Sequence, residues 1–338
     1  LDELEHIPAA DQQVWNNTKG GALFLRAYNH ALLAEMFQKP YRAGSAAIDP
    51  GIPLRLHSDF NERTVRPTIQ KVFDQIREDL QQALLLLPAT APYPTRPSQA
   101  AAYALLAREA LITGDYEHAR LFASQCLQRY SALMDFKTDV TPASTFSIKR
   151  YNAEVLFHDV YTNAFFSTTR AIIDTGLYIS YNDHDLRKSV YFTSQPGIKH
   201  FRGSYDGSGA LFGGITTSEV YLIRAESSAR LGETSAAMND LNTLLRKRWD
   251  GQFVPLQASN SSQALEKILV ERRKELCFKA LRWGDLRRLN QEADYQVTVK
   301  RVLNGQTYIL TPNSSKYTYP IPDDIIKLTG IEQNEREQ

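Results

Sequence analysis

Cysteine is scarce in this chain of 338 residues. The two cysteines, Cys126 and Cys277, are too few to build a disulfide framework in a protein of this length. Each lies in a helical pattern, SQCLQRY and ELCFKA, where we expect a buried free thiol. A disulfide between the two is the alternative, so cysteine usage does not fix the redox compartment.

Long apolar runs are also missing. No run approaches the ~18–20 residues that a membrane-spanning helix needs. The chain opens with LDELEHIPAADQQ, which lacks the basic segment and apolar core of an export signal. We therefore expect a mature or truncated product, in which any export signal would lie outside this chain.

The chain has no strong excess of charge of either sign. Its formal net charge is +1, whereas phosphate binding usually leaves a basic imbalance, so we expect no nucleic-acid partner. Hydrophobic residues at 43% and charged residues at 23% are typical of a globular protein.

Motifs for metal binding, cofactors and catalysis are absent as well. The seven histidines are scattered, and we expect Asp183-His184-Asp185 to shape a turn with an Arg187 ion pair. The glycines of GSYDGSGALFGG fit neither a dinucleotide nor a P-loop pattern. We expect no metal, no cofactor and no catalytic residue. Paired carboxylates for glycoside hydrolysis are an open alternative, because their separation in space decides that chemistry.

Helical periodicity dominates what is present. Helical patterns cover Ala22–Phe37 and Thr68–Leu87, and Ser98 and Gly114 bound a third helix as caps. The stretch that begins in this third helix matches a later stretch at one constant offset. The matched residues are Tyr103 with Tyr221, Ala107 with Ala225, Gly114 with Gly232, Ala119 with Ala237 and Leu127 with Leu245. This is the tetratricopeptide (TPR) helix-hairpin pattern, with a unit of about 34 residues. Two unrelated antiparallel helix pairs are the alternative.

Between these helical blocks, roughly 136–214 is rich in Tyr, Phe, Ser, Thr, Asn and Gly, and AEVLFHDVYT alternates like a strand. A pyranose binds to an exposed aromatic ring beside amide, hydroxyl or charged groups. Candidate ligand residues of this kind are Tyr161, Asn163, Phe166, Arg202, Tyr205 and Asp206. The alternative is that these aromatic residues only pack the loop onto the helices.

Several stretches together resemble the SusD/RagB family of surface nutrient-binding lipoproteins. They are LRAYNHALLAEMF with GIPL, RPTIQKVFDQIREDLQQALLLLP, AAYALLAREALITGDYEHA, YNDHDLRKSVYF, TSEVYLIRAESSARLG, ERRKELCFKALRWGDLRRLN and YTYPIPDDIIKLTGIEQNE. The resemblance implies a mainly α fold, in which TPR-like helical hairpins (an α/α superhelix) carry a long loop-rich insertion with a few short strands. We expect one domain over 1–338, made of helical hairpins at 1–133, the ligand-binding insertion at 134–216, TPR-like hairpins at 217–290 and a tail at 291–338.

The resemblance also implies a function. Such a protein binds an oligo- or polysaccharide on the outer face of the outer membrane and passes it to a TonB-dependent SusC-like porin. Its lipid anchor would lie outside this chain. The alternative is a TPR-type adaptor that binds peptides, against which the long aromatic insertion argues.

The arginine-rich stretch Arg272–Asn290 holds five arginines and two lysines. Glu271 and Lys274, and Glu275 and Lys279, stand three and four positions apart, so they can pair along one helix. No histidine is near them in the sequence, and we expect the thiol of Cys277 to be buried. We expect a structural role for this stretch, with arginines that reach acids on neighbouring helices, such as Glu226.

Overall fold

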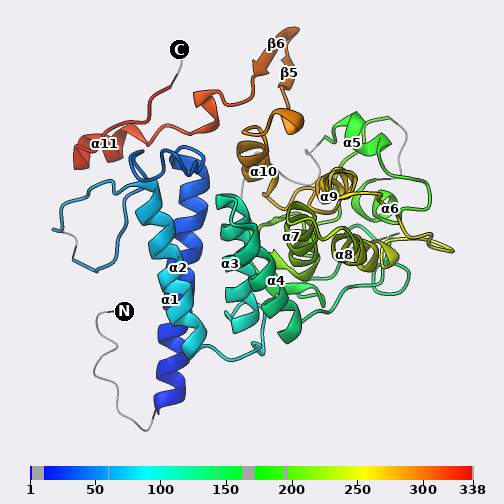
Figure 1. Cartoon of the computed structure of the whole chain (residues 1–338), viewed down its shortest axis with the longest axis horizontal. Helices are drawn as coiled ribbons and strands as arrows, with labels where there is room; N and C mark the ends of the chain where they lie inside the picture. The colour runs from blue at the N-terminus through cyan, green and yellow to red at the C-terminus, as the bar shows by residue number, and fades with distance from the viewer. Residues whose placement is uncertain (2–10, 60, 143, 162–171, 194–196, 337–338) are drawn as a thin grey trace. The chain divides into compact units, whose positions relative to one another are not determined.

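The computed structural model describes residues 1, 11–59, 61–142, 144–161, 172–193 and 197–336. The protein is mainly α-helical, with short strands, as the sequence predicts (Figure 1). It forms two compact units, one made of 1–87 with 283–338 and the other of 88–282. The proposed division into four consecutive parts of a single domain stays a prediction.

In the first unit, α1 (Gln12–Phe37) packs along α2 (Ile69–Leu86) (Figure 1). The predicted apolar face of α2 is buried, including Ile69, Val72 and Ile76. Across the pair, Arg26 binds the fully buried Asp79 with both ends of its guanidinium group, at 2.8 and 2.6 Å. A buried carboxylate needs such a partner, so this ion pair fixes the register of the two helices.

The C-terminal residues of the first unit form α10 (Arg282–Leu289, from Trp283 on), the 3-10 helices η3 (Ala293–Tyr295) and η4 (Ser315–Tyr317), and α11 (Asp323–Thr329). Strands β5 (Val299–Leu303) and β6 (Gln306–Leu310) form an exposed hairpin. The tail then returns to α1, where Tyr319 N donates to Met36 O at 2.8 Å and Asn334 Nδ2 to Phe37 O at 2.8 Å. These bonds hold the tail at the end of α1.

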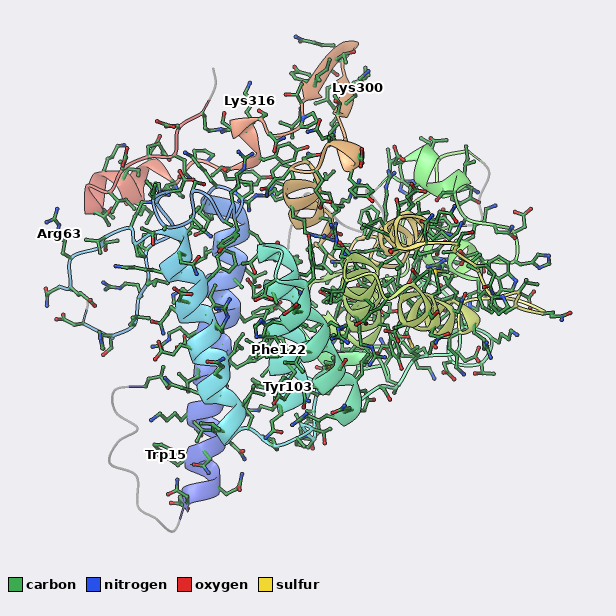
Figure 2. All side chains as sticks on the ribbon, viewed as in Figure 1. Trp15, Arg63, Tyr103, Phe122, Lys300 and Lys316 are labelled. Atoms are coloured by element: carbon green, nitrogen blue, oxygen red, sulfur yellow. The ribbon has the colours of Figure 1, made fainter. Side chains whose placement is uncertain are left out.

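The second unit contains the two predicted hairpins, α3 (Gln99–Thr113) with α4 (Tyr116–Arg129) and α7 (Thr217–Arg230) with α8 (Thr234–Arg246). Ser98 caps α3 by accepting a hydrogen bond from Ala101 N at 3.2 Å, as predicted. Gly114 ends α3 in the left-handed conformation at φ 78°, which costs glycine little. Tyr103 of α3 and Phe122 of α4, labelled in Figure 2, bring their ring centroids to 6.3 Å.

Helix α9 (Ser261–Glu275) packs against α7 and continues the helical layer. All four predicted small residues, Ala107, Ala119, Ala225 and Ala237, are fully buried. Small side chains let helices approach closely, so the helical-hairpin prediction is confirmed in this unit. The thiols of Cys126 and Cys277 are buried and free, as predicted, and burial raises the pKa of each to about 12.

The loop-rich segment of the second unit contains short antiparallel pairs. Strand β1 (Val155–Phe157) pairs with β4 (Ile215–Thr216), and β2 (Val160–Tyr161) pairs with β3 (Leu211–Phe212). Short helices α5 (Thr175–Ile179) and α6 (Arg187–Tyr191) lie between them in the sequence. The segment has its own aromatic core, formed by Phe136, Tyr181, Tyr191, Phe192, Phe201, Tyr205 and Phe212. Much of its aromatic content therefore packs inward.

A buried ionic network joins this segment to the helices that follow it. Arg248 donates to Glu154 Oε1 at 2.6 Å and to Glu275 Oε1 at 2.9 Å, and all three side chains are fully buried. Glu275 also accepts from Arg187 Nη1 at 3.3 Å. Burial would raise the pKa of Glu275, but Arg248 and other nearby cations outweigh burial and lower it to about 2. Glu275 is thus ionised at neutral pH and bridges two arginines.

The turn residues near the network also behave as expected. Arg187 binds Asp185 at 2.7 Å, which confirms the ion pair predicted for the Asp-His-Asp turn. Lys274 binds Glu271 at 2.7 Å, the predicted pair along α9. Lys274 of the arginine-rich stretch thus has the structural role that we expect. Glu275 and Lys279, the other predicted pair, do not share a helix, because α9 ends at Glu275. Glu226, which we named as a possible acid partner, binds Arg230 within α7 at 3.0 Å.

Gly214 is required where β4 begins. A Cβ added there would lie 2.0 Å from Phe157 O and 2.7 Å from Phe212 Cζ. We therefore expect Gly214→Ala to lower the free energy of unfolding by about 1–3 kcal/mol, because strand and ring must move apart. Urea denaturation measures this change.

Gly21→Ala, in α1, is the matched control, because nothing lies within 4 Å of its added Cβ. Alanine should stabilise that helix by about 0.5–1 kcal/mol. A Gly214→Ala variant as stable as the wild type would show that the contact with Phe157 relaxes without cost.

Candidate functional site

The six residues predicted to bind a ligand do not form one exposed group. Tyr161 is half-buried on β2, and its ring lies so close to Gly213 that an added Cβ there would meet Tyr161 Cε2 at 2.1 Å. Asn163 and Phe166 lie outside the described residues. The part they play in ligand binding stays a prediction.

Arg202 connects helix α6 to the loop around Ser144. Its Nη2 donates to Ser189 O at 2.7 Å, and its Nη1 lies 3.4 Å from Ser144 O. Burial lowers the pKa of Arg202. Because its guanidinium group is engaged with backbone carbonyl oxygens, the observed contacts give Arg202 a role in holding α6 and this loop together.

Tyr205 is fully buried. Its hydroxyl group donates to Glu154 Oε2 at 2.7 Å, and Lys279 Nζ lies 3.6 Å from the centre of its ring. The expectation of a solvent-facing Tyr205 ring is therefore corrected. The physical reason is that Glu154 and Lys279 both need partners in the core, and Tyr205 provides a hydroxyl donor for one and a ring face for the other.

Asp206 is the centre of a polar cluster. Its carboxylate accepts from Arg150 Nη2 at 3.0 Å, contacts His158 Nε2 at 3.1 Å and accepts a short hydrogen bond from Ser208. Burial would raise the pKa of Asp206, but the hydrogen bonds from Ser208 and Arg150 outweigh it and lower the pKa. Burial lowers the pKa of His158, with Asp206 opposing this effect. Asp206 is therefore a fixed carboxylate.

Tyr151 presents an aromatic ring to solvent beside this carboxylate. It is 49% exposed, and its ring meets that of His158 edge-on, with centroids 4.9 Å apart. The Arg150 side chain is 51% exposed. We call Arg150, Tyr151, His158, Asp206 and Ser208 the Asp206 cluster.

Sequence reasoning found only Asp206 of these five residues. The stretch KRYNAEVLFHD contains Arg150, Tyr151 and His158, but its sequence pattern indicates only the strand that follows Tyr151. Tyr151 adopts φ 56°, a left-handed conformation that is uncommon for a tyrosine. This conformation, together with the fold of the loop, determines which way the ring faces. An exposed ring can stack on a sugar, and the exposed Arg150 guanidinium group, held by the fixed carboxylate of Asp206, can hydrogen-bond the hydroxyl groups of that sugar.

Other kinds of site find no support in the part of the chain that the structure describes. There, no group of three or more His, Cys, Asp or Glu side chains is placed to hold a metal ion. No helix among the described residues is both long enough and apolar enough to span a bilayer.

Two sequence models of known families match the chain. Residues 1–111 match a SusD-like family described as starch-binding and associating with the outer membrane, and residues 168–336 match the SusD family. The second match covers half of the chain. The protein belongs to the SusD family, which confirms the resemblance seen in its motifs.

Solved structures show the same fold. A SusD-like carbohydrate binding protein from Bacteroides vulgatus superposes with a TM-score of 0.77 at 20% identity, covering 100% of this chain and 81% of that one. A SusD superfamily protein from Bacteroides thetaiotaomicron gives 0.78 at 21% identity, covering 99% and 81%. One from Parabacteroides distasonis gives 0.72 at 16% identity, covering 99% and 81%. A search of the curated proteins finds no match.

Proposed function

We propose that this protein binds an oligo- or polysaccharide at the outward face of the outer membrane and delivers it to a TonB-dependent SusC-like transporter without catalysing a reaction. A lipid anchor outside this chain would hold it there. Membership of the SusD family carries the proposal, since one matching family is described as starch-binding and associating with the outer membrane. A structural neighbour is also named as carbohydrate binding.

The Asp206 cluster is the proposed sugar contact among the described residues. The Tyr151 ring would cover the apolar C–H face of a pyranose, while the exposed Arg150, held by the buried Asp206 carboxylate, would bind hydroxyl groups at its edge. One ring that covers ~50 Å² of sugar contributes only on the order of 1 kcal/mol. Binding at one such point is weak, so a polymer would be retained through several contacts along its length. Tyr161, Asn163 and Phe166 are candidates for those further contacts.

The state of Asp206 favours binding over catalysis. A glycosidase needs one carboxylic acid whose pKa is raised, so that it can protonate the leaving group. The pKa of Asp206 is lowered, and its carboxylate is already engaged by Arg150, His158 and Ser208. It is buried and suited to hold Arg150 in place for a bound sugar, and it lacks the proton of a general acid.

Tyr151→Ala should weaken glycan binding by about 2–10-fold, since an aromatic contact contributes about 0.5–1.5 kcal/mol beyond its buried area. The melting temperature should change little, because the ring is half exposed. Isothermal titration with the best ligand from a glycan array measures the effect. Tyr308→Ala, an equally exposed tyrosine on β6, is the matched control and should bind as the wild type does. If Tyr151→Ala binds the glycan as tightly as the wild type, Tyr151 is not a sugar contact.

The whole proposal is tested by combining that glycan array with affinity purification from outer membranes. We expect glycan binding and recovery of a TonB-dependent transporter. Binding to peptides, with neither a glycan nor a transporter recovered, would instead support a TPR-type adaptor.

A further inference from the structure

A separate pocket of about 460 Å³ lies within the first compact unit. The residues that follow α1, the end of α10 and the segment around η4 line it, and they include Lys39, Arg42, Asp49, Arg287 and Asn290. All of these residues belong to that one unit. The proposed sugar contact at Asp206 belongs to the other unit, so the two sites share no residue.

Two buried side chains on the lining of this pocket carry hydrogen-bond donors. Arg287 is 6% exposed and Asn290 is 1% exposed. They stand three positions apart at the end of α10, so they share one face of that helical turn. Among the residues that the structure describes, none accepts a hydrogen bond from Arg287 Nε or Asn290 Nδ2. A buried donor without an acceptor costs about 1–3 kcal/mol, which favours an acceptor from outside the chain.

The remaining atoms of these two side chains are held firmly. Arg287 Nη1 lies 3.3 Å from Ala34 O and also contacts Glu35 O, and Nη2 contacts Gln38 O, so the guanidinium group caps the C-terminal end of α1. Asn290 Oδ1 accepts a hydrogen bond from Val297 N at 2.8 Å. This bond fixes the orientation of the amide group and leaves Nδ2 as its remaining polar atom. The two donors are therefore presented in a preorganised arrangement.

The charges of the pocket favour an anion. Its lining includes three cationic side chains, Lys39, Arg42 and Arg287, and two carboxylates, Asp49 and Glu335. Lys39 binds both carboxylates, at 3.1 and 3.9 Å. Arg42 binds the neutral amide oxygen of Asn313 at 3.0 Å. Burial lowers the pKa of Arg287 to about 10, so this group is still cationic at neutral pH.

We propose that this pocket binds a small, hydroxylated carboxylate, of the size of an acidic monosaccharide, whose carboxylate oxygens accept from Arg287 Nε and Asn290 Nδ2. A carboxylate offers two acceptor oxygens to two fixed donors and balances the surplus positive charge. The hydroxyl groups of Ser45, Ser314 and Ser315 on the pocket lining suit the hydroxyl groups of such a ligand.

Asn290→Asp tests the proposal. The aspartate keeps an oxygen for Val297 N, removes the amide donor and adds a negative charge. Titration calorimetry with sodium glucuronate should show saturable binding to the wild type and at least about tenfold weaker binding to Asn290→Asp. Arg42→Glu, which changes an exposed wall of the pocket, should also weaken binding and provides a second test if Asn290→Asp does not fold.

Two controls separate this pocket from the proposed glycan site. Glucose, which has the same ring without the carboxylate, should not bind here, and Tyr151→Ala should bind glucuronate as the wild type does. The proposal is overturned if the wild type shows no saturable glucuronate binding, or if folded Asn290→Asp and Arg42→Glu bind as tightly as the wild type. If glucose binds as tightly as glucuronate, the pocket does not recognise the negative charge of the carboxylate.

Discussion

Arg248→Met should lower the free energy of unfolding by about 3–5 kcal/mol, because removing one partner of a buried ion pair leaves charge uncompensated. Arg248 is fully buried and is the partner that Glu154 and Glu275 share. Its guanidinium carbon also lies 4.1 Å from the centre of the Phe136 ring, and its Nη1 donates to Met134 O at 2.7 Å. Methionine preserves much of the volume and none of these polar contacts. Urea denaturation, followed by circular dichroism, measures the loss.

Arg246→Met is the matched control. Arg246 is exposed in the last turn of α8, so the same substitution there should change stability by no more than about 0.5 kcal/mol. If Arg248→Met were as stable as Arg246→Met, the ionic network would contribute nothing net. That result is known for some buried ion pairs when all members are replaced together, but we do not expect it when two carboxylates stay behind.

Tyr205→Ala should destabilise the protein by about 3–5 kcal/mol, the usual cost of truncating a large buried ring. The ring packs against Phe212, with centroids 5.7 Å apart, and Lys279 Nζ lies over its face. The substitution also leaves Glu154 Oε2 without the hydroxyl group that donates to it. Thermal denaturation measures the change, and we expect a clearly lower melting temperature.

Tyr205→Phe separates the ring from the hydroxyl group. It keeps the packing and removes one hydrogen bond to a buried carboxylate, so its cost should be smaller, about 1–3 kcal/mol. If Tyr205→Ala melts like the wild type but loses glycan binding, Tyr205 is a ligand-binding residue after all. Loss of stability with normal binding per folded molecule would place it in the core.

Both predictions concern the junction between the loop-rich segment and the helices. The segment supplies Glu154, Arg187 and Tyr205, while Arg248 and Glu275 lie in and beside the helical hairpins. A loop that carries an exposed binding surface must be held rigid to bind without a large loss of entropy. We therefore expect this network to support the Asp206 cluster without touching the ligand.

The helices could be predicted from the sequence because the residues that begin, end and bury each helix lie within it or next to it. Ser98 caps a helix through its own hydroxyl group, Gly114 ends that helix in a conformation that suits glycine, and Ala107 and Ala225 mark close helix contacts. The periodicity of α2 likewise predicts which of its residues are buried. Family membership also followed from motifs spread along the chain, as the family matches confirm.

The candidate sites depended on contacts between residues far apart in the chain. Tyr205 and Tyr151 are both loop tyrosines, yet one is fully buried and the other is 49% exposed. Nothing in their local sequence separates them, because Tyr205 is buried by its contacts with Glu154 and Lys279, and Tyr151 is exposed by a left-handed backbone turn. Arg287 and Asn290 line a common pocket with residues that follow α1 only because the fold brings Arg287 to the end of that helix. Helix propensity acts between near neighbours along the chain, whereas burial and the placement of polar groups arise from long-range packing.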